Sequence, residues 1–146
     1  MKRPLTRALI ALILLVAVGT VAGWLMPTTY KIERVVTIDA PPAAIHAHVV
    51  DLEQWPAWAP WEEEDPSIVT TYGEKTIGVG ASQTWTSDQG NGELTLTKAD
   101  PESGISYDMA FIMDELRAPA ACAMTYAEAE GSTTVTWTME GDVADF

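Results

Sequence analysis

The sequence predicts an α+β fold, in which one curved antiparallel sheet of about seven strands has a short helix inserted after its first strand. Three observations support this fold class. Apolar and polar residues alternate through most of residues 68–141, which is typical of strands with one buried face. A proline-initiated stretch with apolar residues at helical spacing precedes that region. An uncharged run occupies the N-terminus, and we expect it to lie outside the folded domain.

The N-terminal run predicts a single transmembrane helix. Residues 8–26 carry no charge and follow Lys2, Arg3 and Arg7, and a helix that spans a bilayer needs about 20 apolar residues. Because basic residues favour the cytoplasmic side, the domain would be anchored on the extracytoplasmic side. The alternative is a signal peptide cleaved near residues 21–23, which would leave a secreted domain. The predicted organisation is 1–26 as anchor or signal segment, 27–29 as linker and 30–146 as the domain.

The chain is strongly acidic. Its 8 basic and 21 acidic residues give a net charge of −13. Residues 1–26 hold three of the basic residues and none of the acidic ones, so the remainder carries −16. Such a charge repels phosphate backbones and argues against nucleic-acid binding. The single cysteine, Cys122, excludes an internal disulfide, and its apolar surroundings indicate a small core residue.

The first strand is predicted at residues 30–39. Its alternation places one set of residues on a common face, and β-branched residues are frequent in it. The members of that face are Ile32, Arg34, Val36 and Ile38.

A short helix follows the first strand. Pro41 and Pro42 occupy its expected first turn, where proline is tolerated because the first N–H groups have no partner within the helix. The spacing predicts that the helix continues to Pro56. Its apolar stripe is formed by Ile45, Val49, Leu52 and Trp55.

Residues 51–66 form a tryptophan-rich bend. Trp55, Trp58 and Trp61 are separated by prolines and followed by acids at 62–65, so no long helix can run through the segment. We expect Trp55 to plug the end of the sheet. For Trp58 and Trp61, two interpretations stand: a structural plug, or the rim of a pocket. The acidic run predicts a solvated loop.

Six further strands are predicted, with short connections that favour sequential antiparallel pairing. Gly78 and Gly80 would permit a tight turn between two of them. The predicted strands are 68–76, 79–88, 92–99, 104–114, 119–129 and 132–141. The residues that alternation places on the inner, apolar face are Trp85, Leu94, Leu96, Ile105, Tyr107, Met109, Phe111, Met113, Cys122, Met124, Tyr126, Val135, Trp137 and Met139.

Several motifs resemble the SRPBCC, or START-like, superfamily, and in particular its polyketide cyclase/dehydrase-like branch. They are Tyr30-x-x-x-Arg34, Ile38-x-Ala40-Pro41-Pro42, Val50-Asp51-Leu52-x-x-Trp55-x-x-Trp58-x-Pro60-Trp61, Asp65-Pro66, Gly78-Val79-Gly80-Ala81 with Trp85, and Gly131-Ser132-Thr133-x-Val135-x-Trp137-x-Met139. The resemblance implies a helix-grip fold, in which the sheet wraps a long C-terminal helix and leaves a cavity for apolar ligands.

Two features depart from that pattern. The sequence ends at Phe146, where the gripped helix should begin. We therefore expect the C-terminal helix to be absent, so that either the sequence is a fragment or something else covers the inner face. His46 occupies a helix position where the family usually has an apolar aromatic residue.

The first functional hypothesis is non-catalytic binding of a hydrophobic small molecule or lipid. Flexible methionines on the inner face suit a loosely specified apolar pocket. The predicted ligand-binding residues are Trp58, Trp61, Trp85, Tyr107, Met109, Phe111, Met113, Met124, Trp137 and Met139.

Two other classes remain open. An enzyme of cyclase or dehydratase type would use Asp108, Tyr107 or His46 as acid/base groups, although no catalytic triad can be argued from spacing. A protein-interaction domain would have its open sheet face covered by a partner or a second copy. No metal or cofactor is predicted, because His46 and His48 are two residues apart rather than four.

Overall fold

The computed structural model describes residues 27–113 and 115–145. The transmembrane segment predicted at 8–26 lies outside these residues. Within the described part of the chain, no helix has the length and apolarity needed to cross a bilayer.

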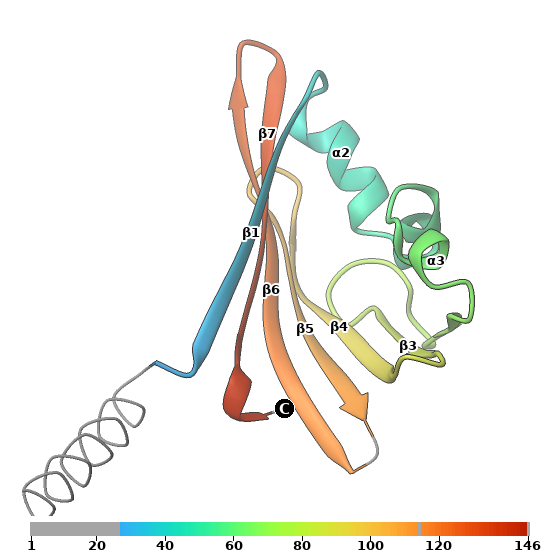
Figure 1. The fold of residues 1–146 in the computed structure, drawn as a ribbon. Helices are drawn as coiled ribbons and strands as arrows, with labels where there is room; N and C mark the ends of the chain where they lie inside the picture. The colour runs from blue at the N-terminus through green and yellow to red at the C-terminus, as the bar shows by residue number, and fades with distance from the viewer. Residues whose placement is uncertain (1–26, 114, 146) are drawn as a thin grey trace, which may run out of the picture.

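One antiparallel sheet of seven strands forms the framework (Figure 1). Its spatial order is β1-β7-β6-β5-β4-β3-β2, so the predicted sequential pairing is confirmed from β2 to β7. The pairing of β1 with β7 places β1 at one edge of the open sheet and joins the first and last strands of the domain. The strands are β1 (Thr29–Ile38), β2 (Val69–Tyr72), β3 (Ser82–Thr86), β4 (Asn91–Asp100), β5 (Gly104–Met113), β6 (Leu116–Ala129) and β7 (Ser132–Asp142).

The helix after β1 is shorter than predicted. Helix α2 (Pro42–Val49) ends before Asp51, and a separate 3₁₀ helix, η1 (Leu52–Ala57), follows. Asp51 is extended, and its side chain accepts a hydrogen bond from the Glu53 backbone N–H at 3.1 Å. This N-cap starts a new helix, so the prediction of one helix ending at Pro56 is wrong. Pro56 lies inside η1 instead.

The acidic run also differs from the prediction. A single turn, α3 (Trp61–Glu64), replaces the expected loop. Its acidic residues, Glu62 to Glu64, lie in the first turn, where negative charge interacts favourably with the helix dipole.

The strands predicted at 68–76 and 79–88 are shorter in the structure, at Val69–Tyr72 and Ser82–Thr86. The connection between them ends in a tight turn, in which the Ala81 N–H donates to the Gly78 carbonyl at 2.9 Å. Gly78 and Gly80 have φ values of +75° and +85°, which favour glycine, so the expected turn is confirmed. The Leu52 N–H donates to the Thr76 carbonyl at 2.9 Å. This hydrogen bond ties the connection to the start of η1.

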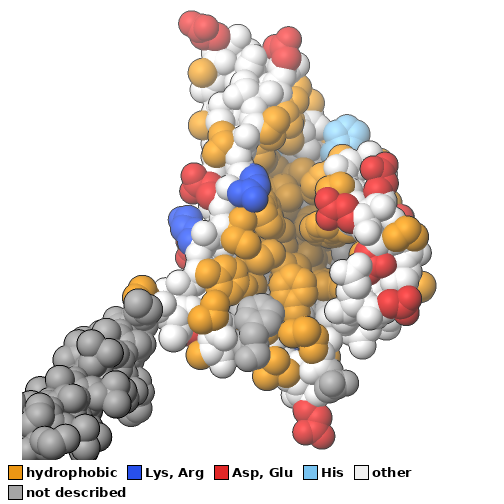
Figure 2. All heavy atoms as spheres, in the orientation of Figure 1, with side chains coloured by type: hydrophobic (Ala, Val, Ile, Leu, Met, Phe, Trp, Pro, Cys, Tyr) orange, Lys and Arg blue, Asp and Glu red, His pale blue; other side chains and the backbone are white. Residues whose placement is uncertain are grey.

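The buried core lies off centre. Leu52 and Trp55 of η1 are 0% and 2% exposed and pack over the middle strands, whereas β1 has no buried residue. Figure 2 shows a broad, hollowed apolar surface between β1 and the helical segment. The helices α2, η1 and α3 therefore cover one end of the inner face and leave the β1–β7 end open. A three-residue 3₁₀ helix, η2 (Val143–Asp145), ends the described chain.

Candidate functional site

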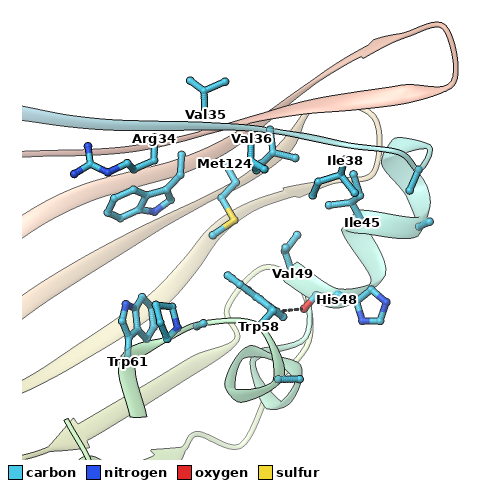
Figure 3. Close-up of a pocket in the computed structure, with 17 residues that line it drawn as sticks. Arg34, Val35, Val36, Ile38, Ile45, His48, Val49, Trp58, Trp61 and Met124 are labelled. Carbon is cyan, nitrogen blue, oxygen red and sulfur yellow. Dashed lines mark hydrogen bonds between the residues drawn. The ribbon is translucent and has the colours of Figure 1, made fainter. Parts of the chain in front are cut away.

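An apolar cavity of about 790 Å³ opens between the β1–β7 end of the sheet and the helical segment. Figure 3 shows side chains from the sheet and from α2 converging on it, with Trp58 and Trp61 on the opposite side. The lining residues are Arg34, Val35, Val36, Ile38, Ala40, Ala44, Ile45, His48, Val49, Ala57, Trp58, Ala59, Pro60, Trp61, Met124, Val135 and Trp137.

The sheet wall follows from strand register. Arg34 pairs with Trp137 and Val36 pairs with Val135 across β1 and β7, and Trp137 pairs with Met124 across β7 and β6. Directly paired residues project to the same face of a sheet. The alternation predicted for β1 therefore places its inner residues in this wall, and Figure 3 shows Val36 on the cavity side and Val35 pointing away.

The helical wall is built on Trp55. Its indole N–H donates to the Val49 carbonyl at 3.0 Å, and its ring lies 5.4 Å from those of Trp58 and Tyr107, centroid to centroid. The centroid of the Trp61 ring is 5.7 Å from that of the Trp55 ring. The expected plug at Trp55 is thus observed.

Trp58 and Trp61 each pack against Trp55 and also expose part of the ring at the cavity. Both contact Trp55, yet they are 41% and 37% exposed and line the cavity. The Trp58 indole N–H donates to the His48 carbonyl at 3.3 Å (Figure 3). This hydrogen bond restrains the orientation of the Trp58 ring where it lines the cavity.

Of the predicted ligand-binding residues, only four line the cavity: Trp58, Trp61, Met124 and Trp137. The predicted residues that belong to strands share the inner face of the sheet, but the others lie elsewhere on it. Tyr107, Met109 and Met139 are buried in the core. Among the remaining predictions, Trp85 and Phe111 pack edge to face at 6.1 Å, and Met113 is exposed at the end of β5.

The ligand-site prediction missed the contributions of β1 and α2. Val36 and Ile38 come from β1, and Ile45 and Val49 from α2. Both apolar faces are visible in the sequence. Their meeting across a cavity is not visible, because it depends on the pairing of β1 with the last strand.

The three candidate acid/base groups do not form one site. Asp108 is exposed and lines a shallow depression on the outer face, between β4, β5 and β6. Tyr107 is buried and its hydroxyl accepts a hydrogen bond from the Trp137 indole at 2.7 Å. Burial raises its pKa far above the ordinary value, which opposes a role in proton abstraction.

His46 lies on α2 beside Tyr126, with 3.5 Å between Nδ1 and the hydroxyl oxygen. Burial lowers the pKa of His46, and Asp100 partly opposes that effect. Burial also raises the pKa of Tyr126 to about 12 and that of the Cys122 thiol to about 11. None of these groups lines the apolar cavity. Among the described residues, no group of three or more His, Cys, Asp or Glu could hold a metal ion.

A curved antiparallel sheet that faces an apolar cavity, with short helices over one end, defines the class of this domain as α+β. The chain belongs to the family described as "Polyketide cyclase / dehydrase and lipid transport", whose model matches residues 29–146. This result confirms the family suggested by the tryptophan and proline motifs.

Solved structures share the fold at low sequence identity. Protein CV1439 from Chromobacterium violaceum matches with a TM-score of 0.57 and 20% identity, over 80% of this chain and 81% of that one. Ara h 8.0201 matches with a TM-score of 0.56 and 15% identity, over 78% and 77%. Ginseng major latex-like protein 151 from Panax ginseng matches with a TM-score of 0.55 and 14% identity, over 79% and 80%. No curated protein matches the sequence.

Proposed function

We propose that this domain binds a hydrophobic small molecule or lipid without catalysis. The observation that carries the proposal is the cavity of about 790 Å³ with apolar walls. Its volume lies within the range of about 300–1,000 Å³ typical of small-molecule sites. The family description includes lipid transport, which supports the same class of ligand.

The exposed tryptophans give the cavity a defined entrance. A monomeric surface rarely keeps a large contiguous apolar patch without a partner, and the inner residues of β1 extend that patch. A hydrophobic ligand would cover Trp58, Trp61 and Val36 together. The enzyme alternative has no such support, because its three candidate groups are separated.

Membrane attachment belongs to the same proposal. The uncharged run at 8–26 and the basic residues before it would hold the domain at the extracytoplasmic face of a membrane. The anchored cavity would then exchange an apolar ligand with the bilayer or with another carrier.

Photolabelling tests the proposed binding. The full chain, held in zwitterionic lipid nanodiscs, is treated with a diazirine-bearing dodecanol, and labelled peptides are mapped by mass spectrometry. We expect saturable labelling of the cavity-lining parts of β6, α2 and η1, suppressed by unlabelled dodecanol. Replacement of Trp58 by Ala should raise the half-saturating concentration roughly fivefold, because about 1 kcal/mol of apolar contact is lost.

Val79→Ala is the matched control. Val79 is also an exposed apolar residue but lies outside the cavity, so its removal should leave labelling unchanged. Apolar-ligand binding at this site would be refuted if labelling did not saturate. It would also be refuted if the half-saturating concentration were the same in the wild type and in Trp58→Ala.

A further inference from the structure

Arg34 occupies an unusual position on the inner wall of the cavity. It lies between Ile32 and Val36 in the inward alternation of β1, and it pairs with Trp137 of β7. Its side chain lines the cavity (Figure 3). Arg34 is exposed, so water can solvate its charge in the free protein. A ligand that displaces this water has to pair with the guanidinium, because desolvating an isolated charge is costly.

Arg34 has no carboxylate partner among the described residues. Lys31 on the opposite face of β1 lies 2.9 Å from Glu140, and Arg117 lies 2.6 Å from Glu93. In the described part of the chain, by contrast, no carboxylate lies within 4.0 Å of the Arg34 guanidinium. Its hydrogen bond goes to the Glu33 backbone carbonyl at 2.9 Å. Most of its five N–H donors therefore remain available to a ligand or to water.

The distribution of charge around the cavity also favours an anionic group beside Arg34. The sequence has 21 acidic residues, yet none of them is among the described residues that line the cavity. Figure 2 shows basic side chains beside the apolar surface on the β1 side, with an acidic side chain near them, and several acidic side chains on the helical side. The cavity thus combines an apolar body with a cationic edge in an otherwise acidic domain.

We propose that the cavity selects an amphiphile with an apolar chain and a carboxylate head, and that Arg34 binds the head. The proposal rests on the apolar-ligand function argued above. A planar guanidinium donates two parallel hydrogen bonds to a carboxylate. The chain of the ligand would extend from Arg34 across Met124 towards Trp58, along the apolar walls.

The net negative charge of the domain does not prevent this pairing. Long-range repulsion of an anion is screened over about 8 Å at physiological ionic strength. A direct hydrogen-bonded pair beside an apolar wall is screened much less. The acidic surface would lower the association rate more than it weakens the bound pair.

A head-group comparison tests the proposal. Photolabelling of the full chain in zwitterionic nanodiscs is measured with diazirine-bearing dodecanoic acid, dodecanol and dodecyl phosphate, at about pH 8 so that the carboxyl is ionised. We expect the acid to reach half-saturation of the cavity peptides at a concentration about tenfold lower than the alcohol. A phosphate that binds more tightly than the acid would overturn the assignment of a carboxylate head.

Two variants of β1 separate recognition from general charge. Arg34→Met should abolish the preference for the acid, and it should change labelling by the alcohol much less than labelling by the acid. Lys31→Met removes the same charge from the outer face and should preserve the preference. An equal response to Lys31→Met would attribute the preference to general charge and refute the inference. No response to Arg34→Met would show that Arg34 does not bind the carboxylate and would refute it too.

The outcomes also distinguish this inference from the proposed function. Saturable labelling by both acid and alcohol at equal concentrations would retain apolar binding and refute head-group recognition. Absence of saturable labelling by every probe would refute the proposed function itself. Loss of labelling by all probes in Arg34→Met would assign the residue a structural role and refute the inference.

Discussion

His46 illustrates how one residue can look functional in sequence and have a packing role in the structure. It is half-buried on α2, its ring contacts Tyr126 edge to face at 6.1 Å, and it does not line the cavity. Burial lowers its pKa, opposed in part by the nearby Asp100 carboxylate. The unfolded chain therefore takes up a proton at this position more readily than the folded chain does. Stability contributed by neutral His46 is complete above its unfolded pKa of about 6.5 and is lost as the pH falls through that value.

This sign gives a testable pH dependence. Between about pH 7.5 and about pH 5, the wild-type chain should lose more unfolding free energy than the His46→Gln variant, which cannot titrate there. Urea unfolding at the two pH values measures the difference. His48→Gln serves as the control, because His48 is exposed at the cavity. A wild-type loss no larger than that of His46→Gln would contradict the assigned role of burial.

At the scale of single elements, strand β4 depends on a glycine for its packing. A Cβ atom on Gly92 would lie 2.0 Å from Cζ2 of Trp85, far inside van der Waals contact. Trp85 lies over Gly92 because these two residues pair across β3 and β4. Gly92 in turn pairs with Phe111 of β5, and the Trp85 ring packs against the Phe111 ring. The absent side chain creates the space for this aromatic pair.

Gly92→Ala should therefore displace Trp85 and lower the free energy of unfolding by about 1–3 kcal/mol, the usual cost of overpacking. Chemical denaturation measures the loss. In a Trp85→Leu background the same substitution should cost much less, since the clash is with the indole ring. Equal costs in the two backgrounds would show that backbone propensity, rather than the Trp85 contact, governs this position.

The elements differ in how far the sequence could predict them. Period-two alternation identified the inner face correctly from Ile105 to Met139, because strand geometry alone determines that pattern. The helix end was missed because Ile45, Val49, Leu52 and Trp55 keep one apolar spacing across two helices. The cap at Asp51 was the available signal for the break.

The cavity required information that no local pattern contains. It forms because β1 pairs with β7, which brings Val36 and Arg34 opposite α2 and Trp58. Such a long-range pairing leaves no periodic trace in either segment. The tryptophan-rich bend did predict part of the site, because Trp58 and Trp61 line the cavity. The alternation of β1 also placed a charged residue, Arg34, on an apolar face, but no site was predicted from it.

At the scale of the whole molecule, electrostatics oppose folding. The net charge of −13 implies self-repulsion in the compact state. The two ion pairs among the described residues, Lys31–Glu140 and Arg117–Glu93, are more than 40% exposed on every side chain. Exposed pairs of this kind contribute about 0–1 kcal/mol. We therefore expect repulsion to outweigh attraction in the response to salt.

Raising sodium chloride from about 0.01 M to about 0.1 M shortens the screening length from about 30 Å to about 10 Å. The midpoint of thermal unfolding should rise over this interval, since screened repulsion stabilises the folded state more than weakened ion pairs destabilise it. Repeating the titration near the isoelectric point of 4.2 should remove most of the effect, because the net charge is then close to zero. A midpoint that falls with salt at neutral pH would mean that the attraction within the surface ion pairs contributes more to stability than the repulsion among the excess acidic residues removes.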